Sequence, residues 1–154
     1  MGKSREVARL PNAPAFSAYR SGSNQSVTAG SWTKVQAQTE EFDTAAAYDN
    51  ASNYRFTPQV AGYYQVNAQL CPAGVTVIRG IAAIYKNGSI FKIGSDYLSD
   101  ATTVARSTVS ALIYMNGTTD YLEMFGFVSA SSGSAFGFAT GADTYFQACL
   151  VRAA

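Results

Sequence analysis

Apolar and polar residues alternate with a period of two over several short stretches of this chain, most clearly at residues 62–70, GYYQVNAQL. Here Tyr64, Val66 and Leu70 share one parity, while Tyr63 has the other. Successive side chains of a β-strand point to opposite faces, so the first set is predicted to face a core. The same alternation predicts that Tyr63 lies on the outer side of the strand.

Similar short runs recur along the chain, separated by segments rich in Gly, Ser, Thr and Asn. No window keeps apolar residues at the 3.6-residue spacing that an amphipathic helix requires. We therefore predict an all-β protein, an antiparallel jelly-roll sandwich of about ten strands. The predicted strands are residues 14–20, 32–38, 54–57, 62–70, 75–86, 90–93, 104–115, 121–128, 135–139 and 144–151.

Two Asn-Gly pairs predict tight turns. Asn87-Gly88 separates IAAIYK from SIFKI, and Asn116-Gly117 follows ALIYM. Both residues of such a pair accept positive φ, which a two-residue hairpin loop needs. Each pair is therefore predicted to form the turn of a hairpin.

Length and composition are those of one folded domain. The chain has 154 residues, 47% of them apolar and 14% charged, which suffices to bury a core without metals or many disulfides. Residues 1–13 are predicted to be a linker or tether and residues 14–154 the globular head domain. No apolar run is long enough to span a bilayer, so no membrane insertion is expected.

The sequence contains no histidine, and this excludes more chemistry than any other feature. Ser/His/Asp and Cys/His catalytic sites and the usual zinc sites are all removed. The acidic residues show no spacing that marks a catalytic pair, so we expect no enzyme and no catalytic residues. A net charge of +1 with scattered charges lacks the basic stripe of a nucleic-acid-binding protein. Cys71 and Cys149 are expected to be buried free thiols.

Several segments, in their order and spacing, resemble the globular head domain of complement component one-q. The similarity spans residues 14–152, nearly the whole chain, from a first strand PAFSAYR to a last strand TYFQACLVR. The combination of segments looks more like the versions at the ends of bacteriophage tail fibres and in bacterial surface proteins. The residues that match the family signature are Asp43, Tyr48, Phe56, Gly62 and Tyr64.

The resemblance implies a tumour-necrosis-factor-like jelly roll that assembles as a homotrimer. By that topology, the strands at 62–70, 121–128 and 144–151 would share the sheet nearest the threefold axis. Their outward rings would then form one apolar cluster, which a trimer would bury. The residues expected at the trimer interface are Tyr63, Tyr121, Phe125, Phe127 and Tyr145.

The resemblance also implies a non-catalytic binding head, the receptor-binding tip of a phage tail fibre that recognises a host-surface glycan or protein. Its location would be the virion or another extracellular surface. Two loops, residues 44–53 and 95–103, mix acids, amides, hydroxyls and a Tyr, which suits a polar ligand. The candidate ligand-binding residues are Tyr48, Asp49, Asn50, Asp96, Tyr97 and Asp100.

Two other functions stay open at this point. The chain could be a structural trimerisation or capping module of a virion or bacterial surface fibre without a ligand of its own. A glycan hydrolase would need two facing carboxylates, for which the sequence offers no defensible pair. No cofactor and no metal are expected, because no EF-hand spacing is present. Some members of the family hold calcium through loop oxygens, and the loop acids that could contribute are Asp43, Asp49, Asp96, Asp100 and Asp143.

Overall fold

The computed structural model describes residues 13–73, 77–98, 106–130, 136–138 and 141–154. These residues form strands and no helix, arranged in two large antiparallel sheets and one small sheet. The predicted all-β sandwich is therefore confirmed.

The first large sheet is five-stranded, with the order β12-β7-β15-β1-β4. Its long strands β7 and β15 pair over most of their length, and β12 and β4 form the two edges. Its strands are β1 (Ala15–Arg20), β4 (Thr39–Asp43), β7 (Gly62–Leu70), β12 (Ser107–Met115) and β15 (Gly141–Ala153).

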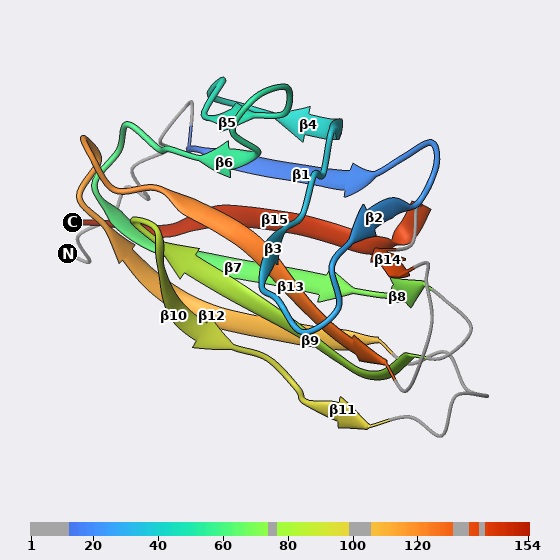
Figure 1. Cartoon of the computed structure of the whole chain (residues 1–154). Helices are drawn as coiled ribbons and strands as arrows, with labels where there is room; N and C mark the ends of the chain where they lie inside the picture. Colours follow the sequence, from blue (N-terminus) through green and yellow to red (C-terminus); the bar gives the residue numbers. More distant parts are fainter. Residues whose placement is uncertain (1–12, 74–76, 99–105, 131–135, 139–140) are drawn as a thin grey trace, which may run out of the picture.

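The second large sheet is seven-stranded, with the order β10-β9-β13-β6-β5, while β11 pairs with β9 and β3 with β13. Its strands are β3 (Thr33–Lys34), β5 (Tyr48–Asp49), β6 (Arg55–Phe56), β9 (Val77–Lys86), β10 (Ser89–Ile93), β11 (Tyr97–Leu98) and β13 (Leu122–Ala130). The small sheet has the order β2-β14-β8. Its strands are β2 (Gln25–Val27), β8 (Pro72–Ala73) and β14 (Phe136–Phe138). In Figure 1, β9 and β13 cross in front of β7, β12 and β15.

The core lies between the two large sheets and is rich in aromatic rings. Phe16 of β1 stacks on Tyr48 and on Phe56, with ring centroids 4.5 and 4.6 Å apart. Tyr64 of β7 is fully buried and donates its hydroxyl hydrogen bond to the Val60 carbonyl oxygen at 2.8 Å. The alternation of residues 62–70 predicted this burial correctly, since Tyr64, Val66 and Leu70 all have exposures of 0%.

The two Asn-Gly pairs behave differently. Asn87 and Gly88 have φ values of 53° and 79° and join β9 to β10 in a two-residue hairpin, as predicted. Asn116-Gly117 does not form a hairpin, because β12 and β13 lie in different sheets. The Asn116 side-chain oxygen instead accepts the N–H groups of Thr118, Thr119 and Asp120, which shapes a connection across the end of the sandwich.

The sheet assignment of residues 121–128 was wrong. β13 pairs with β9 from Leu122 to Ala130 and belongs to the seven-stranded sheet. The strand that lies beside β7 is β12, with Tyr114 opposite Tyr63. The connection after Met115 crosses the sandwich, so β13 is on the far side of the core from β7 and β15.

The two cysteines are free thiols in unlike environments. Cys71 is buried as expected, and burial raises the pKa of its thiol. Cys149 is exposed, contrary to expectation, because its position on β15 faces outward from the five-stranded sheet.

Candidate functional site

The outer face of the five-stranded sheet carries large apolar side chains at one end. Tyr114 of β12 lies opposite Tyr63 of β7, with ring centroids 5.4 Å apart. Leu112 stands one repeat further along β12 and is 57% exposed, while Tyr63 and Tyr114 are each 43% exposed. Contiguous exposed apolar side chains of this size mark an interaction surface on a folded domain.

A row of polar side chains crosses the middle of the same face. The Gln65 amide donates to the Ser110 hydroxyl over 2.9 Å, and that hydroxyl donates to the Asn67 Oδ1 over 2.8 Å. These hydrogen bonds satisfy part of the polar capacity of the row within the chain, which lowers the cost of covering this face with another surface.

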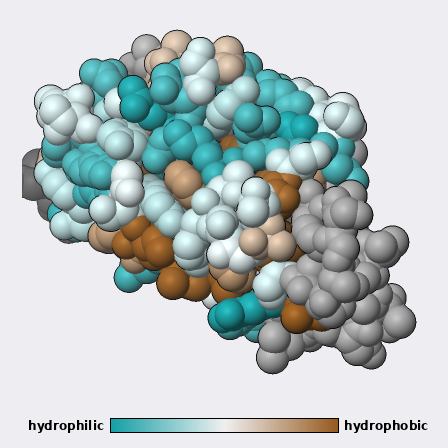
Figure 2. Space-filling model, viewed as in Figure 1, coloured by the Kyte–Doolittle hydropathy of each residue, from teal (hydrophilic) through white to brown (hydrophobic). Residues whose placement is uncertain are grey.

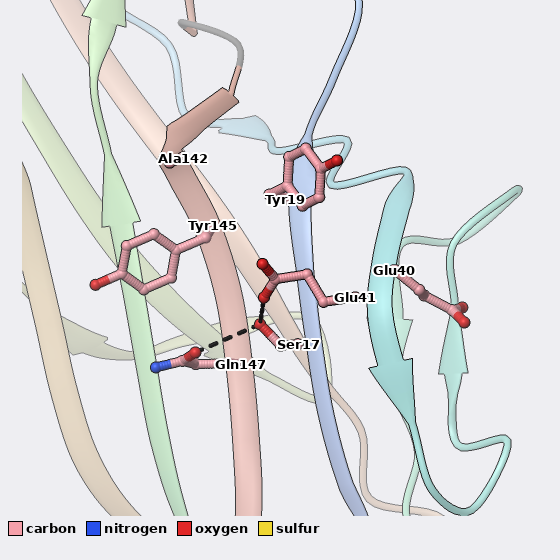
Figure 3. A pocket seen from close by; sticks show the side chains of 7 residues that line it. All are labelled: Ser17, Tyr19, Glu40, Glu41, Ala142, Tyr145 and Gln147. Carbon is pink, nitrogen blue, oxygen red and sulfur yellow. Dashed lines mark hydrogen bonds between the residues drawn. The ribbon is translucent and has the colours of Figure 1, made fainter.

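Beyond the polar row, a hollow of about 660 Å³ lies where β1, β4 and β15 meet. The Ser17 hydroxyl donates to the Glu41 carboxylate over 2.6 Å. Figure 3 shows the Glu41 carboxylate directed towards Ser17, near the rings of Tyr19 and Tyr145, while Glu40 points away. The ion pairs of the described residues do not include Glu41. We call this feature the Glu41 hollow, and its lining residues are Ser17, Tyr19, Glu40, Glu41, Ala142, Tyr145 and Gln147.

The edge strand β10 adds further exposed apolar surface. All of its residues are exposed, including Ile90 at 45%, Phe91 at 44% and Ile93 at 56%. Figure 2 shows hydrophobic side chains gathered over β10 on an otherwise polar surface. Because Lys86 at the end of β9 donates to the Tyr114 carbonyl oxygen over 2.7 Å, this edge adjoins β12. We call β10 together with Leu112 and Tyr114 the apolar edge.

The residues predicted for the trimer interface do not share one face. Tyr63 and Tyr145 lie on the outer face of the five-stranded sheet. Tyr121, Phe125 and Phe127 belong to the segment that enters and forms β13, so they lie on the other sheet. The prediction that these rings form one cluster was therefore wrong.

The outer face of the seven-stranded sheet is covered by the chain's own residues. Trp32 lies against Phe127, with ring centroids 5.5 Å apart, and Tyr85 stacks on Phe125 at 3.8 Å. Lys34 of β3 forms an ion pair of 2.6 Å with Glu123. The main chain before β3 is fixed by the Gly30 N–H, which donates to the Val128 carbonyl oxygen. These rings thus pack internally.

Two of the three predicted ligand-binding residues of the first loop, Tyr48 and Asp49, are used by the fold. Tyr48 is only 6% exposed and donates its hydroxyl to the Ala37 carbonyl oxygen, so it belongs to the core and not to a contact surface. Burial raises its pKa well above the ordinary tyrosine range. Asp49 accepts the N–H groups of Ser52 and Ala51, and these bonds with the Asn53 amide lower its pKa to about 2.

Residues 95–98, the described part of the second predicted loop, lie at the other end of the sandwich (Figure 1). Asp96 pairs with Arg79 near the start of β9, and this hydrogen-bonded contact lowers the pKa of Asp96. Thr44, by contrast, donates its N–H to the Ala15 carbonyl oxygen at the opposite end. One chain therefore cannot form a single site from both loops. Asp100 and the side chain of Tyr97 lie outside the described residues.

Comparison with solved structures shows the fold. The globular domain of zebrafish complement 1qA matches with a TM-score of 0.66 at 14% identity, covering 92% of this chain and 99% of that one. The fold is that of the complement and tumour-necrosis-factor heads. The Eiger tumour necrosis factor of S. frugiperda matches with a TM-score of 0.67 at 9% identity, covering 92% of this chain and 95% of that one.

The PRD1 vertex protein P5 has the same jelly roll, with a TM-score of 0.63 at 18% identity over 91% of this chain and 98% of that one. No protein-family model and no curated protein matches the sequence. The resemblance read from the sequence is therefore confirmed as a complement-like and tumour-necrosis-factor-like head at the level of the fold.

Two further properties bear on ligands and location. Within the described residues, no group of three or more Cys, Asp or Glu is placed to hold a metal ion. The expectation that no metal is bound stays a prediction, and Asp100, one of the acids that could contribute to a calcium site, lies outside those residues. In the part of the chain that the structure describes, no helix has the length and hydrophobicity to cross a membrane.

The exposed apolar side chains of Leu112, Tyr114 and β10 were not predicted from the sequence. The alternation of STVSALIYM could have placed Leu112 and Tyr114 outward, because their parity is opposite to that of the buried Ile113 and Met115. Nothing in the short run SIFKI indicates that its residues are all exposed. That exposure follows from the position of β10 at a sheet edge.

Proposed function

We propose that the protein is a non-catalytic homotrimeric binding head, the receptor-binding tip of a phage tail fibre. The observation that carries the proposal is the apolar surface formed by the end of the five-stranded sheet and the apolar edge. A soluble domain that exposes such a surface is stabilised by covering it with further copies. The similarity to the PRD1 vertex protein P5 and to complement heads supports the same assignment.

In this proposal the head recognises a host-surface glycan or protein on a virion or other extracellular surface. Three copies would present each loop three times around one axis, and such repetition multiplies weak contacts into useful avidity. Asn50 and Asp96 sit in loops at opposite ends of the sandwich, so only one of these ends can face the receptor. The carboxylate of Asp49 is already engaged by its own loop.

The first test is the native mass in solution, measured by light scattering or native mass spectrometry. A mass of three chains supports the proposal, and a monomer at all concentrations contradicts it. The trimer would then be screened on host cells and glycans, with Asn50→Ala and Asp96→Ala as separate variants for the two ends. Loss of binding with one variant alone identifies the receptor-facing end.

A structural trimerisation or capping module is the second candidate. It is favoured by the involvement of Tyr48, Asp49 and Asp96 in contacts within the chain. A trimer that binds no cell or glycan at high local concentration would support this function over receptor binding.

A further inference from the structure

The apolar edge and the Glu41 hollow lie at opposite sides of the five-stranded sheet. The edge is formed by β12 and the neighbouring β10, while the hollow lies against β4, the other edge strand. Phe42 of β4, which is 50% exposed, adds an apolar side chain beside the hollow. Each copy thus carries two unlike surfaces on opposite sides, an arrangement that favours head-to-tail contacts closing into a ring.

The charges of the two surfaces are complementary. Lys92 projects from the apolar edge between Phe91 and Ile93, and its ammonium lies 5.3 Å from the Phe91 ring centroid. The ion pairs of the described residues include neither Lys92 nor Glu41. Edge-to-edge contact between two copies would bring two Lys92 side chains together, and hollow-to-hollow contact would do the same for Glu41. Only edge-to-hollow contact pairs opposite charges.

The strand register indicates that Lys92 and Glu41 lie at the same level along the strand direction. Ser17, which contacts Glu41, pairs with Gln147 of β15. Gln147 pairs with Asn67 of β7, and Asn67 pairs with Ser110 of β12, so these residues form one row across the sheet. At the apolar edge, the Ser95 N–H donates to the Thr108 carbonyl oxygen, and a Cβ on Gly94 would clash with that same carbonyl.

Lys86 and Ser95, on either side of β10, bind the carbonyl oxygens of Tyr114 and Thr108, so β10 and β12 run in opposite directions. Counting back from Gly94, which approaches Thr108, places the Lys92 main chain level with Ser110 and Ala111. Cyclic symmetry involves no translation along its axis, so with an axis along the strands, groups at equal heights meet.

We propose that Lys92 of one copy enters the Glu41 hollow of the next and pairs with the Glu41 carboxylate between the rings of Tyr19 and Tyr145. This inference rests on the proposed trimer and names the contact that joins its copies. The tyrosine faces suit an ammonium group, and the apolar neighbours of Lys92 exclude water from the pair. Phe42 and the outer side of β15 then receive Phe91 and Ile93.

The test is a charge exchange measured by sedimentation or native mass spectrometry across a dilution series. Lys92→Glu and Glu41→Lys should each raise the concentration of half-dissociation at least about tenfold, since each places like charges in contact. The combined variant restores opposite charges and should return to within about threefold of the unmodified chain. The control is Gln36→Glu with Gln59→Glu, two exposed residues away from both surfaces, which changes net charge as much as Lys92→Glu.

The outcomes separate this contact from the trimer itself. If the unmodified chain is a monomer, the proposed function fails before the exchange is made. If it is a trimer and Lys92→Glu behaves as the control does, the trimer stands and the Lys92–Glu41 contact is wrong. Circular dichroism checks that each variant folds. Glu41→Gln, which keeps an acceptor for Ser17, replaces Glu41→Lys if that variant does not fold, with a weakened trimer expected and an unchanged one contradicting the contact.

Discussion

The two outer faces of the sandwich both carry aromatic rings, yet only one is covered by its own chain. On the seven-stranded sheet, Phe125 and Phe127 lie beneath or beside Trp32, Tyr85 and the Lys34 side chain. On the five-stranded sheet, the Lys86 ammonium lies 6.0 Å from the Tyr114 ring centroid, but within the described residues no Trp or Phe ring packs on Tyr63 or Tyr114, and these two rings and Leu112 remain about half exposed.

The difference comes from where the short strands attach. β3 pairs with β13 through Lys34 opposite Phe125, and this brings Trp32 over the seven-stranded sheet. The corresponding attachment on the other sheet is β4, which pairs at the edge of β1 and leaves the middle of the face open. One face is therefore covered within the chain, while the described residues leave the other open, and this open face is the surface that we propose joins the copies.

The largest expected effect comes from Leu112→Asp on the open face. A carboxylate there would have to be desolvated in the assembled form, so we expect the trimer to be weakened by about 4 kcal/mol, roughly a thousandfold. Leu112 is 57% exposed in one chain, so the monomer should keep its free energy of unfolding within about 0.5 kcal/mol. Native mass and a denaturant titration measure the two quantities.

The control for this variant is Thr118→Asp, at an exposed loop position outside the apolar edge. A Leu112→Asp protein that stays trimeric would show that the open face is not the contact surface. A large loss of monomer stability would show instead that Leu112 supports the fold.

The next effect is Trp32→Ala on the covered face. Removing the ring uncovers Phe127 and Tyr85, and because Trp32 is half-buried the free energy of unfolding should fall by about 2 kcal/mol. The trimer mass should not change. Trp32→Phe, which keeps an aromatic cover, should cost less than about 1 kcal/mol. If Trp32→Ala dissociated the trimer without lowering the free energy of unfolding, Trp32 would lie at an interface between copies. The seven-stranded sheet would then not be the face that the chain covers by itself.

The core could be predicted from sequence even where the sheet assignment was wrong. Leu122 and Met124 alternate with the predicted outward rings Phe125 and Phe127 and are buried as that alternation requires, although β13 lies in the other sheet. Both large sheets pack one face against the same core, so alternation selects the buried residues whichever sheet a strand joins. The outward residues of the two sheets instead face opposite sides of the sandwich. Grouping Tyr63 with Phe125 and Phe127 therefore failed.

The covering of a face depends on pairings that local pattern does not contain. Trp32 and Phe127 are far apart in sequence, and the two-residue strand β3 that brings them together is too short for alternation to reveal. The turn at Asn87-Gly88 was predictable because its chemistry is local. The candidate site could not be predicted from local sequence, since the Glu41 hollow requires β1, β4 and β15 to be in register.

The smallest expected effects concern two carboxylates, Glu40 of the five-stranded sheet and Glu123 of the seven-stranded sheet. Both are measured in the monomeric Leu112→Asp background. Desolvation, and then repulsion by Asp43, raises the pKa of Glu40 above 4.5. Its charge therefore opposes folding, with stability highest below the unfolded pKa and lost as pH rises through the folded one. Glu40→Gln should stabilise the monomer by about 0.3 kcal/mol at pH 7, a value kept small by solvent screening, and should have no effect below about pH 4.

Glu123→Gln should do the reverse on the covered face. Its side chain is 7% exposed and paired with Lys34, so losing the charge should cost about 1 kcal/mol at neutral pH. Opposite signs in thermal melts at pH 7 would mean that the charge of Glu123 is satisfied within the chain and that the charge of Glu40 is not. Equal signs would show that Glu40 already has a favourable environment in the single chain.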